Sequence, residues 1–396
     1  MNKPGKNTGW GAFLADVFVC SLGAYGGPEA HYGVFADHMV SRKKHLTEEE
    51  LLELIALTGI LPGPSSTQTI VAIGYKVGGP VLGALTLLVW AAPVLTVMTM
   101  LSFLGAFLEQ RRISPGILRY IGPMAVGFII VAAYRLGRKA IADKTAFLLM
   151  LFAGTTTYFI HEPWIYPLVL IAGGAFAAAA SKEKNIWNRV RLDPPWAYLA
   201  AFAATALAGF AAITVSDNRI VHLFESFYRY GYLVIGGGQV VVPLMFSELV
   251  EANRYMSDQE FLTGFGLVQG LPGPMFSFSA YAGGMAARGS GVLFQILGAA
   301  AGGIGIFMPG VLLIYFVYPI WENLKAIRGI RIALRGVTAA ACGLIAASAV
   351  VLMRKNGFSA DALVATAASA GLLLLRKIPA PVIVAACIIA GVVIPF

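Results

Sequence analysis

Leu61-Pro62-Gly63-Pro64 recurs unchanged as Leu271-Pro272-Gly273-Pro274. Each proline lacks an amide donor and restricts the residue before it, so neither copy can lie within a continuous helix. Both copies nevertheless stand between apolar segments. Backbone that leaves a helix at membrane depth is tolerated only where protein or water covers its polar groups. One copy alone would suit a turn at the membrane surface, but the duplication favours a pair of functional helix breaks.

The composition indicates an integral membrane protein. The chain is 58% hydrophobic and 12% charged, with a mean hydropathy of +0.75. Its 396 residues would accommodate roughly ten to thirteen spans of about 20 residues. Lys and Arg in short loops explain the net charge of +9, so no nucleic-acid partner is expected. Cys20, Cys342 and Cys387 lie far apart in apolar runs and predict neither a disulfide nor a metal site.

The chain is predicted to consist of two homologous halves, residues 1–185 and 190–396, on either side of the polar linker 181–195. A shift of 210 residues places the capping box at 47–50 on a second one at 257–260, and Gly26-Gly27 on Gly236-Gly237. We therefore expect an all-α, polytopic membrane fold of two helical repeats. An odd number of spans per half would invert the second repeat, which is the arrangement we expect, and an even number would leave the repeats parallel.

The segments around the first LPGP motif are too short to span a bilayer. The helix that begins at Thr47 runs to Leu61, about 15 residues or roughly 22 Å, and the hydrocarbon core is about 30 Å thick. A second short segment covers 65–77. Two half-length helices joined by a break predict a re-entrant hairpin or a discontinuous span.

A second break is expected at Gly26-Gly27-Pro28, where ionisable side chains follow. Glu29 and His31 are candidates for proton coupling, because ionisable residues within a span are costly and usually face a cavity. Asp37 and His38 fit that description as well, or else lie in water at the interface.

Several stretches together resemble the chromate ion transporter family in its long-chain, two-domain form. In the first half they are Gly-Gly-Pro-Glu-Ala-His (26–31), Leu-Pro-Gly-Pro-Ser-Ser-Thr-Gln (61–68) and Gly-Tyr-Lys (74–76); in the second, Gly-Gly-Gly-Gln-Val-Val-Val-Pro (236–243) and the second LPGP. The resemblance implies a secondary transporter that exports chromate, with sulfate as a structural analogue, and two halves of opposite membrane orientation. Lys76 stands where arginine is more usual in the family, and Arg288 lies near the place of its counterpart.

The residues give independent support for an anion site. A helix N-terminus offers unpaired amides and about half a positive charge, and Pro64 suits the start of a helix. The hydroxyls of Ser65, Ser66 and Thr67 would then face a tetrahedral oxyanion, although capping alone would account for one of them. The second half lacks this polar run, so the first half is expected to supply more of the ligands. The predicted substrate-binding residues are Gly26, Gly27, Pro62, Gly63, Pro64, Ser65, Ser66, Thr67, Gln68, Gly237, Gly238, Gln239, Pro272, Gly273, Pro274 and Ser277.

Lys76 and Arg288 are expected to attract anions at the mouth rather than to bind them. Lys76 lies 12 residues beyond Pro64, which is roughly 18 Å along a helix. His161-Glu162-Pro163 lacks the second histidine of a zinc-protease motif, and no Walker A motif occurs. We therefore expect no enzyme activity, metal or cofactor.

The expected function is potential- or proton-driven efflux of chromate or sulfate across the inner (plasma) membrane. The alternatives are a cation-coupled uptake permease and a passive anion channel. The bilayer is the expected environment, and a homodimer is left open.

Overall fold

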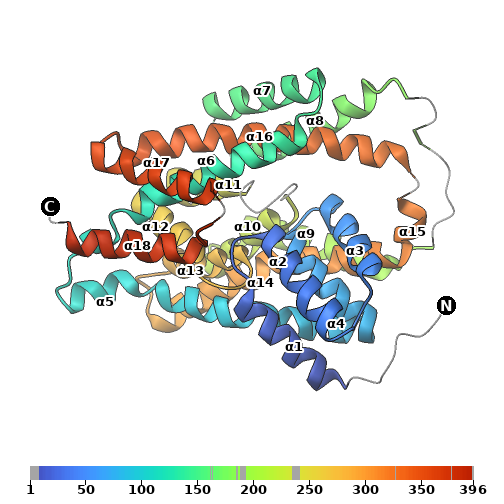
Figure 1. The fold of residues 1–396 in the computed structure, drawn as a ribbon, viewed down its shortest axis with the longest axis horizontal. Helices are drawn as coiled ribbons and strands as arrows, with labels where there is room; N and C mark the ends of the chain where they lie inside the picture. The colour runs from blue at the N-terminus through green and yellow to red at the C-terminus, as the bar shows by residue number, and fades with distance from the viewer. Residues whose placement is uncertain are drawn as a thin grey trace. The chain divides into compact units, whose positions relative to one another are not determined.

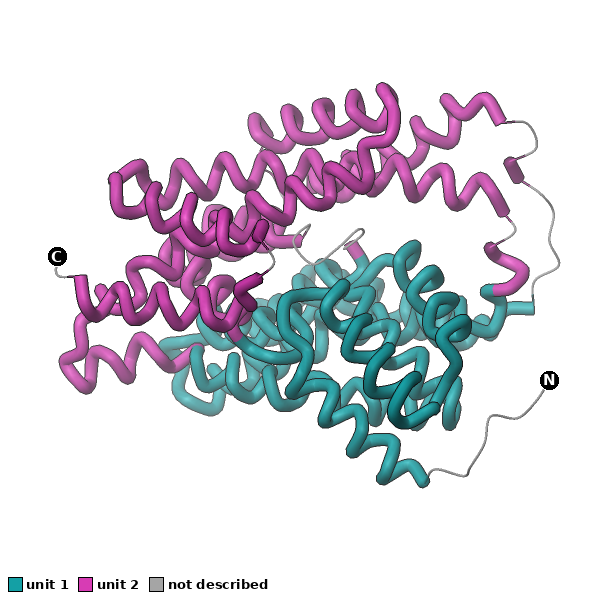
Figure 2. Tube along the Cα trace, viewed as in Figure 1, with its two compact units in different colours: residues 1–101, 193–232, 271–321 teal, residues 102–192, 233–270, 322–396 magenta. Residues whose placement is uncertain are grey.

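The computed structural model describes residues 9–160, 162, 164–183, 186–187, 193–233, 241–325, 327–375 and 377–394, and within these ranges it contains helices and no strand (Figure 1). The all-α prediction is confirmed. The chain forms two compact units: unit 1 comprises residues 1–101, 193–232 and 271–321, and unit 2 comprises 102–192, 233–270 and 322–396 (Figure 2). Each unit therefore draws on both halves of the sequence.

Unit 1 contains both LPGP motifs. Its elements are α1 (Trp10–Gly23), α2 (Pro28–Phe35), the π-helix η1 (Ala36–Arg42), α3 (Glu48–Ile60), α4 (Ser65–Leu101), α9 (Trp196–Val215), α10 (Arg219–Leu233), the 3₁₀ turn η5 (Met275–Ser277), α13 (Phe278–Ala286), α14 (Val292–Val317) and η6 (Tyr318–Ile320).

Small residues set the spacing of helices in unit 1. A Cβ added at Gly298 would meet the carbonyl oxygen of Gly283 at 2.5 Å, so α13 and α14 pack backbone to backbone. The Gly298/Gly302 pair is spaced for such an approach, which is how membrane helices compensate for the absence of a hydrophobic drive between them. Both α13 and α14 also pack on α4, which places the second LPGP region against the first.

The predicted half-length segments are present. α3 ends at Ile60, and α4 begins at Ser65 but leaves the helical region at Gly78 (φ −149°, ψ 21°) and Gly79 (φ 78°, ψ −170°). Residues 65–77 are therefore a short helix of their own, roughly 20 Å long, as the sequence predicts.

Unit 2 is a helical bundle built around α16. Its elements are α5 (Leu104–Gln110), the 3₁₀ turn η2 (Pro115–Leu118), α6 (Ile121–Ala140), α7 (Lys144–Phe159), α8 (Ile165–Ala179), α11 (Val242–Phe246), the π-helix η4 (Ser247–Ala252), α12 (Asp258–Val268), α15 (Trp321–Leu324), α16 (Arg328–Asn356), α17 (Ala360–Leu374) and α18 (Ala380–Val393). α16 packs on α6, α7 and α8.

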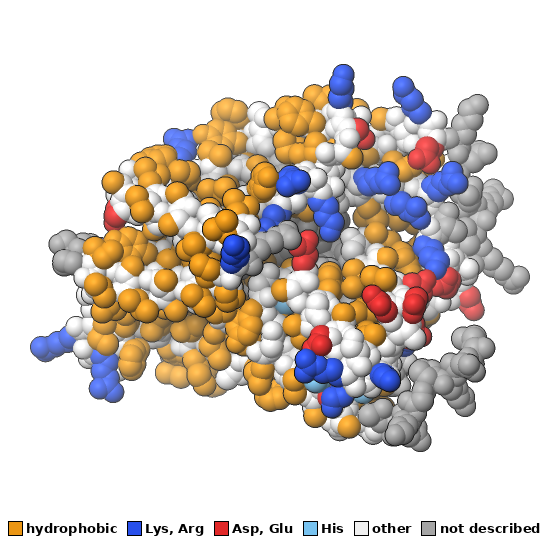
Figure 3. Space-filling model, viewed as in Figure 1, with side chains coloured by type: hydrophobic (Ala, Val, Ile, Leu, Met, Phe, Trp, Pro, Cys, Tyr) orange, Lys and Arg blue, Asp and Glu red, His pale blue; other side chains and the backbone are white. Residues whose placement is uncertain are grey.

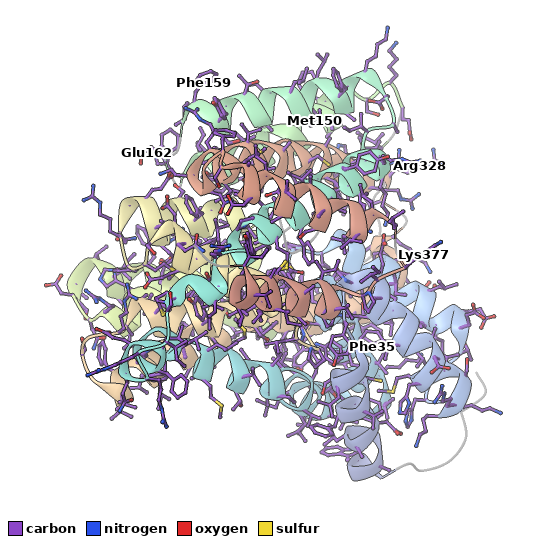
Figure 4. The ribbon with its side chains drawn as sticks, turned by 60° about the vertical axis from the view of Figure 1, so that its left-hand side comes forward. Phe35, Met150, Phe159, Glu162, Arg328 and Lys377 are labelled. Atoms are coloured by element: carbon purple, nitrogen blue, oxygen red, sulfur yellow. The ribbon has the colours of Figure 1, made fainter. Side chains whose placement is uncertain are left out.

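The surface is that of a membrane protein. Among the described residues, five helices are long and apolar enough to span a bilayer: Ser65–Leu101, Pro115–Ala140, Trp196–Val215, Val292–Leu324 and Arg328–Asn356. Figure 3 shows hydrophobic side chains over much of the visible face, and Phe159 at the end of α7 is 75% exposed (Figure 4). Exposed apolar surface of this extent suits contact with lipid rather than water.

The segment that leads into the capping box has matching backbone geometry in the two sequence copies. Lys43 and His45 donate their amides to His38 and Met39; Asn253 and Tyr255 donate theirs to Glu248 and Leu249, each 210 positions later. Lys44 (φ 55°) and Arg254 (φ 53°) are both left-handed. The capping boxes of Thr47 and Ser257 both form. Agreement at this level of detail is structural support for two homologous repeats.

Candidate anion-binding site at the helix breaks

The helix breaks at the Gly-Gly-Pro motif and at the two LPGP motifs lie in unit 1, and each has a glycine in the left-handed region. Gly26 (φ 89°) and Gly27 (φ 92°) precede α2, Gly63 (φ 125°) precedes α4, and Gly273 (φ 103°) precedes η5. Only glycine adopts such angles without strain. The amide of Gly273 donates to the carbonyl of Ala24 at 2.7 Å, which joins the first and third breaks directly.

His31 connects the first break to the second. Its Nδ1 is hydrogen-bonded to Ser66 Oγ at 2.9 Å, so the first turn of α2 contacts the first turn of α4. The ring is 1% exposed and meets Trp90 edge-on at 5.4 Å between centroids. Its Nε2 has no hydrogen-bond partner among the described residues. A buried ring nitrogen without a partner calls for an explanation, and a ligand or water is the simplest one.

Other polar groups that follow the second break make internal hydrogen bonds, whereas Gln68 Oε1 is buried with no partner among the described residues. Gln68 Nε2 donates to the carbonyls of Pro62 (2.8 Å) and Gly310 (3.3 Å) and so ties the break to α14. Thr67 Oγ1 accepts from Trp90 Nε1 at 3.2 Å. Ser65 is half-buried, and its carbonyl accepts from the Thr69 hydroxyl at 2.9 Å. Thr67 and Gln68 therefore hold the shape of the break.

The second copy contributes free hydroxyls. Ser277 and Ser279 are 0% and 1% exposed, and within the part of the chain that the structure describes neither Oγ has a hydrogen-bond partner. They lie on η5 and α13, which both pack on α4. A buried hydroxyl left unpaired costs about 1–3 kcal/mol. Together with His31 Nε2 they are unused polar atoms close to the breaks.

The predicted mouth residues lie apart from these groups. Lys76 Nζ pairs with Glu50 Oε1 at 2.9 Å, beyond the far end of the 65–77 helix from the break. Desolvation raises the pKa of Glu50, but the hydrogen bonds from Lys76 and from the Thr47 amide outweigh it and hold that pKa below its usual value. Arg288 is exposed, just after α13. Glu29 is exposed on the first turn of α2.

The predictions at Gly237, Gly238 and Gln239 fall outside the described residues. Two residues of the site were not singled out in the sequence. Trp90 contacts His31 and Thr67, and the carbonyl of Gly310 accepts a hydrogen bond from Gln68. The structure adds Asp16 in α1 as well, which accepts from His38 and His45. A lone carboxylate within an apolar run was the signal for Asp16; nothing local marks Gly310.

Comparison with known proteins agrees with this picture. The family model described as "Chromate transporter" matches residues 12–179 and again 221–392. The chain is 24% identical over 387 residues to a "Probable chromate transport protein" of Synechococcus elongatus, covering 95% of this chain and 94% of that one. It is 27% identical over 379 residues to a "Chromate transport protein" of Cupriavidus metallidurans, covering 93% and 89%.

A shorter relative matches only part of the chain. It is an "Uncharacterized transporter" of Bacillus subtilis, 26% identical over 160 residues, which are 39% of this chain and 80% of that protein. No solved structure matches the chain. Because the family model matches twice and covers most of both halves, the chain belongs to the chromate transporter family and contains two copies of its domain.

Proposed function

We propose that the protein is a secondary transporter that exports chromate, and sulfate as its structural analogue, across the inner (plasma) membrane. The observation that carries the proposal is a set of buried polar atoms beside the linked helix breaks of unit 1 that have no partner within the described part of the chain: His31 Nε2, Ser277 Oγ and Ser279 Oγ. The relatives named chromate transport proteins supply the substrate class.

The binding mode follows from these groups. A tetrahedral dianion needs donors on several sides, and helix N-termini with serine hydroxyls provide them without a formal positive charge. α2 and α4 begin at Pro28 and Ser65, and His31 joins their first turns. Neutral donors suit a carrier, because an anion held by lysine or arginine in low dielectric would be released slowly. The substrate-binding set remains as predicted, with Thr67 and Gln68 acting through the shape of the break.

The direction follows from electrical work. Moving one charge across the membrane is worth about 2.3 kcal/mol per 100 mV, so a dianion gains roughly 4.6 kcal/mol on leaving a negative interior. An importer would have to bring in more than two cations to overcome this, and it would need several acidic groups near the site. Glu29 is the acidic residue adjacent to a break, and Gln239 stands at its place in the second copy. Efflux is the direction that these residues favour.

The two repeats, residues 1–185 and 190–396, are proposed to have opposite membrane orientation. Site-specific cysteine labelling would test this at Lys6 and at Lys182 in the linker. Labelling from opposite sides is the expected result, and labelling of both from one side would contradict the inverted arrangement.

Transport is tested with purified protein in liposomes, with the membrane potential and the pH gradient imposed separately. We expect chromate to leave a negative interior at a rate that rises with the potential. Net uptake against a negative interior would instead indicate a cation-coupled importer. Flux without saturation and with a linear current–voltage relation would indicate a passive channel.

A further inference from the structure

A buried carboxylate in α1 is surrounded by three nitrogen-bearing side chains from the following segment. His38 Nε2 donates to Asp16 Oδ1 at 3.0 Å, and His45 Nε2 donates to Asp16 Oδ2 at 2.9 Å. Lys43 Nζ lies 2.9 Å from Oδ1. The Asp16 side chain is 8% exposed, His45 is 3% and His38 is 13%, whereas Lys43 is 47% exposed. The side chains of Asp16, His38 and His45 are therefore largely buried, and Lys43 is the member of the group that is in contact with water.

Charge balance shows what this group can do. With both imidazoles neutral, the Asp16 carboxylate and the Lys43 ammonium cancel. Each imidazole uses its Nε2–H toward the carboxylate, so Nδ1 is the atom that can accept a proton. A proton on either ring gives the group a net positive charge while it is still partly buried. Because a buried net charge is costly, this state requires that the group becomes exposed or that an anion moves to compensate the charge.

The ionisable groups on the neighbouring elements lie outside this cluster. α3, which packs on η1, carries the exposed Glu48, Glu49 and Glu53, and Glu50, which is paired with Lys76. On α1 the nearest ionisable group is Cys20, one turn further on, and it is a buried thiol. On the same helix as His38, Asp37 is paired with Arg42 at 2.9 Å and both are exposed. α4, which packs on α1, carries only Tyr75 and Lys76 as ionisable residues, and Lys76 is paired with Glu50. Glu29 and His31 on α2 belong to the break described above.

The second copy shows that the backbone does not need this cluster. It has the same π-helix, the same left-handed residue and the same backbone hydrogen bonds. Yet the positions of Asp16, His38, Lys43 and His45 are occupied there by Ser226, Glu248, Asn253 and Tyr255. The fold of this segment forms with either set, so the buried histidine–aspartate group of the first copy has a role beyond shaping the turn.

The cluster connects to the anion site through one helix. α2 and η1 run without interruption from Pro28 to Arg42, and His38 lies seven residues, about two turns, after His31. A change of charge at His38 therefore acts on the helix whose first turn contacts Ser66.

We propose that Asp16, His38 and His45 form a proton-binding site that couples proton movement to oxyanion transport. This inference rests on the proposed function and names its coupling group. When His38 or His45 accepts a proton from water at Nδ1, the charge balance around Asp16 is lost and the contact of α2–η1 with α1 is weakened. The ring returns the proton to water later in the cycle, so that proton binding and release accompany the transport of the anion.

The test uses the full chain in liposomes, with chromate as the probe and the potential clamped, and compares His38→Gln, His45→Gln and Asp16→Asn with the wild type. The exposed Asp37→Asn is the matched control, because Asp37 is paired with Arg42 at the surface. We expect an imposed pH gradient to accelerate wild-type and control flux, and each cluster variant to lose at least about ten-fold of that acceleration. Chromate exchange at equilibrium, without gradients, should stay within about two-fold of the wild type.

A second measurement needs no variant. A pH indicator trapped with the wild-type protein should report proton movement that starts on addition of chromate. Variants that keep their response to the pH gradient, or a wild type that moves chromate without protons, would overturn this inference and leave potential-driven export standing. A wild type that moves no oxyanion would overturn both.

Discussion

The two LPGP segments break at matching glycines and differ after the break. Both begin with a capping box, at Thr47 and at Ser257, and both break at a left-handed glycine, Gly63 or Gly273. After the break the first copy starts an α-helix in which Thr67 and Gln68 Nε2 bond internally. The second starts a 3₁₀ turn, and the hydroxyls of Ser277 and Ser279 have no partner among the described residues. The break is common to both copies, and we propose that the first copy mainly shapes the site and the second supplies hydroxyls for binding.

The largest expected effect comes from filling the breaks. At Gly63 (φ 125°) a Cβ would lie 2.7 Å from Gln68 Nε2, and at Gly273 (φ 103°) it would lie 3.0 Å from Val94 Cγ1. We expect Gly63→Leu and Gly273→Leu, like Pro64→Leu and Pro274→Leu, to lower chromate flux at least about a hundred-fold while the protein still inserts. The cost at the glycines is backbone strain of about 1–3 kcal/mol in addition to the clash.

Gly59→Leu is the matched control, because Gly59 lies in helical backbone of the same hairpin with nothing within 4 Å of an added Cβ. Flux assays on protein that elutes as a single species provide the comparison. Near-normal flux in the Gly63 and Gly273 variants would mean that the breaks are ordinary turns.

The next effect should separate binding from shaping. Ser66→Ala, Ser277→Ala and Ser279→Ala each remove a neutral donor to an anion, which should cost about 1.5–3 kcal/mol, or roughly ten- to a hundred-fold in apparent affinity. Thr67→Val and Gln68→Leu should lower the melting temperature in addition to the affinity, because they remove the hydrogen bonds to Trp90 and to the Gly310 carbonyl. Thr96→Ala, on an exposed part of α4, is the control. Equal, small changes in affinity at all five site positions would indicate that these side chains only cap helices and do not bind the anion.

The ion pair of the first copy has no counterpart in the second, where Ala286 stands at the place of Lys76. Lys76→Gln should therefore change stability by less than about 1 kcal/mol, since the pair is partly exposed. The folded-state pKa of Glu50 is lowered, so its stabilising contribution is present near neutral pH and is lost as pH falls through that pKa. Melting curves of the wild type and Lys76→Gln should converge in acid, and a constant difference would show that Glu50 is not the partner that matters.

A change of similar size, which should leave transport unaffected, tests the equivalence of the copies themselves. Thr47 Oγ1 and Ser257 Oγ each accept an amide at 3.2 Å. Thr47→Ala and Ser257→Ala should each cost about 1 kcal/mol and leave chromate affinity unchanged, as measured by thermal unfolding and by flux. A change in affinity from either one would show that the caps are part of the binding site.

The sequence by itself determined the elements whose cause is local. Proline and glycine break a helix wherever they stand, the capping boxes need only residues three apart, and a 210-residue register shows the duplication. The short helix 65–77 follows in the same way, because it ends at two adjacent glycines.

Only the tertiary structure decided which polar groups remain free to bind. The Thr67 hydroxyl is bound to Trp90, and Gln68 Nε2 is bound to Gly310, 242 residues away, whereas the hydroxyls of Ser277 and Ser279 have no partner among the described residues. Asp16 acquires its histidines because a π-helix and a left-handed lysine turn the chain back onto α1. Hydrogen-bond partners distant in sequence are set by packing, and a local pattern carries no information about them.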